Sequence, residues 1–173
     1  MKPKCGDEVT LLYTDTDSYI YEIETDDFYR DIAGDVETWF DTSEFDASHP
    51  SGIQTGVNKK VINMMKNEAG GKIIQECVCL GAKQYSYEDF SEHKRCKGVK
   101  KNVVENTITH DDHKNCALYH KEQRRTLNVI RSHLHDVYTE EVNKVALSAE
   151  DDKRVIMEDG IHTLAYGHYR LKN

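Results

Sequence analysis

Long apolar runs are missing from this sequence. It has no stretch of about 18 consecutive apolar residues, which is roughly what a membrane-spanning helix requires, and its first residues lack the basic-then-apolar pattern of a secretory leader. We therefore expect a soluble protein with no membrane partner that is not secreted. Its expected location is intracellular, in the nucleus or the cytoplasm.

A disulfide framework is also missing. The cysteines are odd in number and irregularly spaced: Cys5, Cys77, Cys79, Cys96 and Cys116. This pattern favours free thiols in a reducing compartment. Cys77 and Cys79 share one face of an expected strand, but zinc would require two more ligands at workable spacing. We therefore expect both to be small buried residues.

An excess of positive charge, which is typical of proteins that bind DNA, is missing from the chain as a whole. The net charge is −8, but it is unevenly distributed. Residues 1–57 hold 14 acidic and 3 basic residues, whereas residues 58–173 hold 17 acidic and 20 basic residues. The second part is therefore mildly basic, which is compatible with a nucleic-acid partner or with two differently solvated surfaces.

The most informative stretch is residues 9–23, VTLLYTDTDSYIYEI. Two runs rich in aromatic and β-branched residues flank a polar turn, which predicts an antiparallel hairpin. Asp15 and Asp17 should lie at its tip. Paired carboxylates repel each other unless they are solvated, protonated or bound to a cation, and Mg²⁺ is a natural oxygen-liganded partner.

Two interpretations of this acidic pair remain open from the residues alone. The first is a solvated acidic turn. The second is the Asp-x-Asp motif of a Mn²⁺-dependent nucleotide-sugar transferase, although that fold expects a nucleotide-binding βαβ region before a motif that here begins near residue 13.

Residues 13–18, Tyr-Thr-Asp-Thr-Asp-Ser, resemble motif C of family B DNA polymerases, written Tyr-x-Asp-Thr-Asp-Ser. The resemblance implies a palm hairpin in which Asp17 is the principal ligand of catalytic Mg²⁺ (or Mn²⁺) and Asp15 is an auxiliary one. Downstream, Lys83 and Tyr85 resemble the Lys-x-Tyr motif that holds the primer terminus in that family. Period-two spacing on a strand would place these two side chains on one face.

A basic segment, residues 94–101, follows the Lys-x-Tyr element. It is either a solvated turn or a surface that tracks phosphates, with Gly98 allowing close backbone approach. Lys97-Gly98 resembles an element at the palm–thumb junction of protein-primed family B polymerases. Lys97, Gly98, Lys100 and Lys101 are accordingly expected to contact DNA.

The remaining elements follow from periodicity and capping. Thr25 should cap a helix over residues 25–40, whose stripe of Phe28, Ile32, Val36 and Phe40 packs beneath the hairpin. Residues 42–57 should be a loop, 59–67 are ambiguous, Gly70-Gly71 is a break, and 72–80 and 82–87 are strands.

In the C-terminal part, Thr109 and Asp112 predict a helix to about residue 123. On it, His110 and His113 should form an exposed polar turn rather than a metal site with Asp111 and Asp112. Strands are expected at 126–131, 136–144, 154–158 and 161–168, with turns at 148–152 and 159–160.

The expected fold is α+β: an antiparallel palm-type sheet with a packed helix (residues 1–98), then a small β-rich, thumb-like unit (residues 99–173). The whole order resembles the C-terminal third of a protein-primed family B DNA polymerase of Polinton or Maverick transposons and related viruses. That family implies a DNA primer–template, a deoxynucleoside triphosphate and a terminal protein primer as partners.

Other elements of that family have no counterpart in the sequence. They include the Asp-x-x-Ser-Leu-Tyr-Pro element with the partner carboxylate, the Lys-x-x-x-Asn-Ser-x-Tyr-Gly fingers helix and the exonuclease motifs. A two-metal centre needs ligands from more than one strand. We therefore expect this chain alone to be an inactive polymerase fragment, whose hairpin lacks a neighbouring strand. The alternative is a non-catalytic module that binds DNA or a protein partner.

Overall fold

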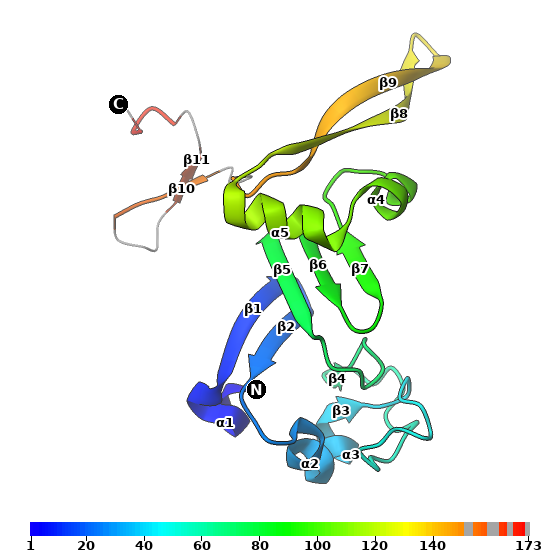
Figure 1. Ribbon diagram of the computed structural model, residues 1–173, viewed down its shortest axis with the longest axis vertical. Coiled ribbons are helices and arrows are strands. Elements are labelled where there is room, and N and C mark those ends of the chain that lie inside the picture. Colours follow the sequence, from blue (N-terminus) through cyan, green and yellow to red (C-terminus); the bar gives the residue numbers. More distant parts are fainter. Residues whose placement is uncertain (151–153, 159–162, 166–167, 172–173) are drawn as a thin grey trace. The chain divides into compact units, whose positions relative to one another are not determined.

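A computed structural model describes residues 1–150, 154–158, 163–165 and 168–171 of the chain (Figure 1). These residues form short helices and small sheets, so the expected α+β class is confirmed. The chain divides into two compact units: unit 1 is Met1–Cys77 with Tyr87–Ser91, and unit 2 is Val78–Ser86 with Glu92–Asn173. This division differs from the expected boundary after residue 98. None of the helices in the described ranges is long and apolar enough to span a membrane.

Unit 1 contains the predicted hairpin. Strands β1 (Val9–Asp15) and β2 (Ser18–Ile23) pair antiparallel around a two-residue turn, Thr16 and Asp17. Two short helical turns, α1 (Lys2–Cys5) and η1 (Gly6–Glu8), precede it. Within the described residues the hairpin forms a sheet of these two strands.

The expected single helix over residues 25–40 is interrupted. It consists of α2 (Phe28–Ile32), the 3-10 turn η2 (Ala33–Asp35) and α3 (Val36–Trp39). The cap is Asp27 rather than Thr25, because the Asp27 carboxylate accepts the first free backbone N–H groups of α2 at 3.1 Å. A glycine inside η2 weakens the helical conformation at the interruption.

The apolar stripe of these helices builds the core of unit 1, as its spacing predicts. The buried members of this core are Ile32, Val36, Phe45 and Ile53, and Phe28, Tyr29, Phe40 and Val57 pack against them. The stripe therefore packs on side chains of the following loop, and the expected packing beneath the hairpin is wrong. Trp39, beside the stripe, is 58% exposed.

The ambiguous segment 59–67 contributes only a short strand. Here β3 (Phe40–Asp41) and β4 (Met65–Lys66) pair in parallel. The buried Asp41 carboxylate accepts hydrogen bonds from the backbone N–H of Ser43 (2.9 Å) and of Lys60 (3.0 Å). A hydrogen bond from the Ser43 side chain is the main cause that holds the pKa of Asp41 below its usual range despite burial, and the backbone N–H groups of Lys60 and Ser43 lower the pKa further. The Asp41 carboxylate thus holds the backbone at Ser43 and Lys60 together.

A three-stranded sheet, most of whose residues belong to unit 2, has the order β5 (Glu76–Gly81), β6 (Gln84–Glu88), β7 (Glu92–Arg95). The first two strands are shorter than the expected 72–80 and 82–87. The third, β7, lies at the start of the basic segment, where no strand was expected.

Two helices follow, α4 (Lys101–Thr107) and α5 (His110–Tyr119). The predicted capping box is confirmed. The Thr109 hydroxyl accepts from the N–H of Asp112 (3.1 Å), and the Asp112 carboxylate accepts from the N–H of Thr109 (3.0 Å). The helix ends before residue 123 because His120 adopts a left-handed conformation, φ 52°.

The core of unit 2 lies against α5. It consists of buried Cys96, Val104, Ile108, Cys116, Ala146 and Leu147. The expectation of an exposed polar first turn is wrong, since His110 and His113 are both buried.

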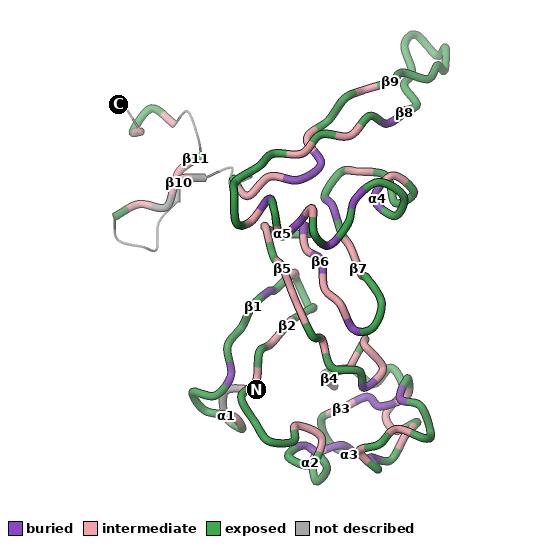
Figure 2. The backbone as a smooth tube through the Cα atoms, in the orientation of Figure 1, coloured by how far each residue is buried: buried purple, intermediate pink, exposed green. Residues whose placement is uncertain are grey.

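Strands β8 (Gln123–His133) and β9 (Asp136–Leu147) pair antiparallel in a long hairpin. They include the two strands predicted at 126–131 and 136–144, and each is longer than predicted. Its turn residues, Leu134 and His135, both have positive φ (48° and 72°), which suits a two-residue hairpin turn. Most of its length is exposed (Figure 2). Ala146 and Leu147 are buried at its base, and Leu127 is buried in the middle part of β8.

The last strands, β10 (Arg154–Ile156) and β11 (Thr163–Ala165), pair antiparallel. Each lies within a range predicted as strand. Residues 151–153, 159–162, 166–167 and 172–173 lie outside the described residues. Outside the described residues lie the whole of the turn predicted at 159–160, part of the turn predicted at 148–152 and part of the strand predicted at 161–168.

Candidate metal and nucleic-acid site

The two carboxylates of the polymerase-like motif both lie at the turn of the β1–β2 hairpin. Asp15 is the last residue of β1, opposite Ser18, and Asp17 is an exposed turn residue. Between them Thr16 has φ 59°, and its hydroxyl donates to Asp15 Oδ1 at 3.3 Å. A β-branched residue rarely adopts this left-handed conformation. A positive φ at this position suits a two-residue hairpin turn, so the two carboxylates are what make this turn a candidate site.

The donor atoms of this turn fit a hard divalent cation. Asp15 and Asp17 offer carboxylate oxygens, and Ser18 offers a hydroxyl at the next position along the chain. Mg²⁺ and Mn²⁺ prefer such oxygen ligands, and Mg²⁺ keeps several waters when few protein ligands are available. The turn can therefore supply part of a coordination shell, while a centre with two metal ions requires ligands from another element as well.

Lys83 and Tyr85 do not share one face of a strand. Lys83 lies in the turn between β5 and β6 with φ 60°, and Tyr85 is a half-buried residue of β6. The same-face argument applied the period of a continuous strand to residues that a hairpin turn separates. Cys77 and Cys79 precede this turn on β5, and the expectation that both are buried is also wrong, because Cys79 is exposed.

The basic segment divides into an inward and an outward part. Lys97 and Lys100 are exposed, Gly98 has φ +71°, and Lys101 begins α4, where it pairs with Glu105 at 3.5 Å. Exposed cations beside a glycine turn can reach phosphate oxygens. These residues therefore remain candidates for DNA contact.

Lys94, at the start of the same segment, has a structural role. Its side chain is only 10% exposed, and Nζ donates to Glu92 Oε2 (2.8 Å) and to the carbonyl of Ile108 (2.5 Å). Burial raises the pKa of Glu92, but the hydrogen bonds from Lys94 and from the His110 N–H outweigh it and lower that pKa. Lys94 is therefore engaged within the protein and is not available to a phosphate.

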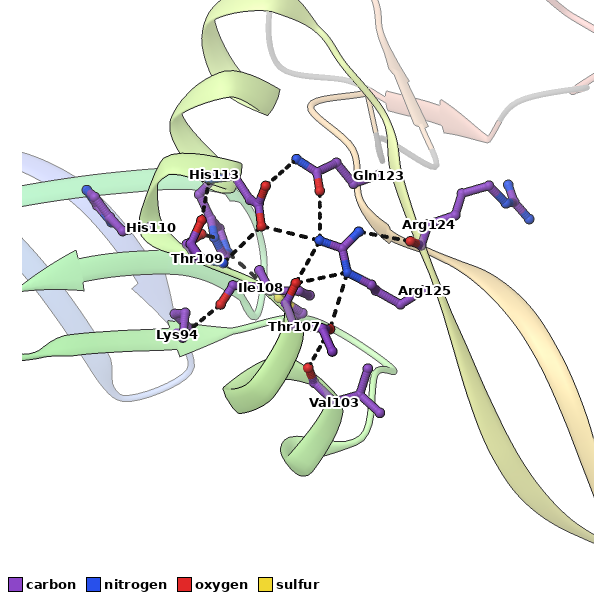
Figure 3. Close-up of polar contacts among 12 residues, drawn as sticks. Lys94, Val103, Thr107, Ile108, Thr109, His110, His113, Gln123, Arg124 and Arg125 are labelled. Atoms are coloured by element: carbon purple, nitrogen blue, oxygen red, sulfur yellow. Dashed lines mark hydrogen bonds and ion pairs between the residues drawn. The ribbon is translucent and has the colours of Figure 1, made fainter.

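Arg125 joins three elements of unit 2, and sequence reasoning missed it (Figure 3). Its guanidinium donates to the carbonyl of Thr107 (2.8 and 3.1 Å), to Gln123 Oε1 (2.9 Å) and to Asp112 Oδ2 (3.3 Å). It thus ties the end of α4 and the first turn of α5 to the start of β8. The capping box identifies Asp112 from the sequence, but nothing local indicates its partner thirteen residues later.

The buried histidines make separate contacts. His110 Nδ1 lies 2.8 Å from Ser86 Oγ, whereas His113 Nδ1 lies 3.1 Å from the carbonyl of Thr109 and its Nε2 lies 3.7 Å from Cys96 Sγ. Burial lowers the pKa of His113 and raises that of Cys96 to about 11. Since Asp112 faces Arg125 instead, these groups do not assemble the metal site that was considered for this turn.

A comparison of the chain with models of known protein families, with curated proteins and with solved structures finds no significant match.

Proposed function

We propose that this chain contributes metal-binding carboxylates and primer–template contacts to a DNA-directed DNA polymerase of the protein-primed family B type. The observation that carries the proposal is the placement of Asp15 and Asp17 at the tip of an antiparallel hairpin, around a left-handed Thr16. The six-residue motif that suggests the family is therefore also a compact structural unit with ligand oxygens at its exposed end.

In this proposal Asp17 is the principal ligand and Asp15 the auxiliary one. The exposed Asp17 carboxylate can approach a cation without displacing other side chains. Asp15 is held on the strand and accepts a hydrogen bond from Thr16, so it positions the turn as well as adding charge. When bound, Mg²⁺ or Mn²⁺ would supply charge neutralisation for phosphoryl transfer from a deoxynucleoside triphosphate.

The DNA contacts belong to unit 2. Lys97, Lys100 and Lys101 are assigned to the primer–template backbone, with Gly98 permitting close approach. Lys83, on its exposed turn, and Tyr85 are assigned to the primer terminus. Lysines that contact phosphates give affinity without base specificity, so binding should be insensitive to sequence and sensitive to salt.

Two carboxylates from one turn leave most of a two-metal centre to other ligands. We therefore expect no nucleotide incorporation by this chain alone. Salt-dependent DNA binding without incorporation, even after addition of a complementary polymerase segment, would identify a non-catalytic DNA-binding module instead.

The test is a Mn²⁺ titration followed by electron paramagnetic resonance of the free ion. The unsubstituted chain should bind Mn²⁺ weakly, and Asp17→Asn should reduce the affinity by about tenfold or more, since a charged contact contributes roughly 1.5–3 kcal/mol. Asp15→Asn should reduce the affinity less.

Asp26→Asn is the matched control, because it removes an exposed acid from the same acidic unit outside the turn. It should leave the affinity nearly unchanged. Equal losses in Asp17→Asn and Asp26→Asn would mean that the acidic surface as a whole attracts the ion, and the proposal would be rejected.

A further inference from the structure

A pocket with a volume of about 570 Å³ lies in unit 2 at the base of the β8–β9 hairpin. Strand ends and the glycine turn of the basic segment surround it. Its polar lining includes Gln84, Lys97, Arg124, Asn143, Lys144 and Ser148. Pockets of about 300–1,000 Å³ are typical of sites for small molecules and cofactors.

The charge of this pocket has one sign. Lys97, Arg124 and Lys144 contribute three cationic side chains, and no acidic residue is among the described residues that line it. Glu122, which is outside the lining, pairs with Arg124 at 3.0 Å at the protein surface. Side chains of like charge gather in one concave site most favourably when an anion joins them.

Several contacts hold the cations in place. Lys144 Nζ donates to the carbonyl of Gly98 at 3.0 Å, and a Cβ atom at Gly98 would overlap that ammonium. Arg124 Nε donates to Asn143 Oδ1 at 2.7 Å, so the guanidinium and the amide orient each other. The lining also includes a polar side chain that is almost fully buried, Gln84, which is only 4% exposed.

We propose that this pocket binds a phosphate-bearing ligand about the size of a nucleotide. Arginine and lysine side chains recognise phosphate oxygens through charge-assisted hydrogen bonds, and the amides and hydroxyl of the lining can orient the remainder of the ligand. The phosphate can belong to a free nucleotide or to a nucleic-acid strand. The pocket shares Lys97 and Gly98 with the proposed DNA contacts, so the inference rests on and deepens that part of the proposed function. It uses no residue of the β1–β2 turn and is tested separately from the proposed metal site.

The experiment is isothermal titration calorimetry of the full chain in EDTA, which removes any contribution from metal at the Asp15–Asp17 turn. One probe is inorganic triphosphate and the other is an oligothymidylate of eight nucleotides. Lys144→Gln and Arg124→Gln should each weaken binding of the preferred probe by about tenfold. Gly98→Ala should also weaken it, although it changes no charge, and circular dichroism would confirm that this variant folds.

Lys121→Gln is the matched control, because it removes an exposed lysine of unit 2 that neither lines the pocket nor belongs to the proposed DNA contacts. It should change the affinity by less than about twofold. Preference for triphosphate would assign a free nucleotide, and preference for the oligonucleotide would assign a strand. The site is rejected if neither probe binds, or if Lys121→Gln weakens binding as much as Lys144→Gln does.

Discussion

The two hairpins of this protein, β1–β2 and β8–β9, are both two-stranded within the described residues, yet they are stabilised differently. The β1–β2 hairpin buries Val9 and Tyr13 and carries its polar turn at the far end. The β8–β9 hairpin buries Ala146 and Leu147 at its base and Leu127 in the middle part of β8. An isolated two-stranded hairpin is marginal in water. The comparison indicates that buried residues at its base stabilise the long, mostly exposed β8–β9 hairpin. The short β1–β2 hairpin tolerates a left-handed threonine in its turn.

The largest effect on stability is expected from removing Arg125, which anchors the base of the β8–β9 hairpin. Arg125→Gln should lower the free energy of unfolding of unit 2 by about 2 kcal/mol, because Asp112 and the Thr107 carbonyl lose their charged donor. The measurement is urea unfolding followed by hydrogen exchange of β8 peptides. Arg124→Gln is the control, since its half-exposed pair with Glu122 should contribute less than about 1 kcal/mol. Equal effects of the two variants would mean that the base of β8–β9 is not anchored by Arg125.

A smaller effect is expected from acidification. Burial lowers the pKa of His113 in the folded protein below its usual value of about 6.5. Below that pH the unfolded chain takes up a proton that folded His113 excludes, so the stability of unit 2 should fall as the pH drops from 7 toward 5. Urea midpoints across this range measure the slope. His113→Gln should flatten it, whereas the exposed His120→Gln should leave it unchanged, and the reverse pattern would contradict the assignment.

The smallest effect concerns the strained turn of the shorter hairpin. Thr16→Gly should stabilise unit 1 by about 0.5 kcal/mol, since glycine avoids a left-handed cost of roughly 1–2 kcal/mol but loses more entropy on folding. The single tryptophan, Trp39, belongs to unit 1, so its fluorescence during urea unfolding reports this unit. Thr10→Gly, at an exposed strand position, should instead destabilise it. Destabilisation by Thr16→Gly would show that the turn is not strained.

Sequence reasoning succeeded where the signal is local. The β1–β2 hairpin, the Thr109–Asp112 capping box and the Phe28–Phe40 stripe depend on residues a few positions apart. It failed where distant partners decide the outcome. His110 and His113 follow a polar cap and resemble a solvated turn, yet Ser86 and Cys96 from earlier in the chain bury and contact them.

In the candidate site, too, the residues with a local signal were predicted and those that depend on distant partners were not. Asp15 and Asp17 were located correctly at the hairpin tip, because motif and turn coincide in sequence. The pocket at Lys97, Arg124 and Lys144 was only partly indicated, because two of these cations come from strands that lie far beyond the basic segment. Lys83 and Tyr85 have the spacing of a Lys-x-Tyr motif, but Lys83 lies in the turn before β6 and Tyr85 lies on β6. The sequence indicates this turn only weakly.

The ladder of β8 and β9 also has a consequence for how unit 2 folds. Its residue pairs lie close in the chain, from His133 opposite Asp136 outward, so each step closes only a short loop. Hairpins of this kind form within about 1–10 μs, far faster than contacts between distant segments. As the ladder closes toward its base it carries Leu147 back to the level of Gln123. We therefore expect the ribbon to form early and to deliver the last apolar residues of the core, so that substitutions near its turn slow folding more than they speed unfolding.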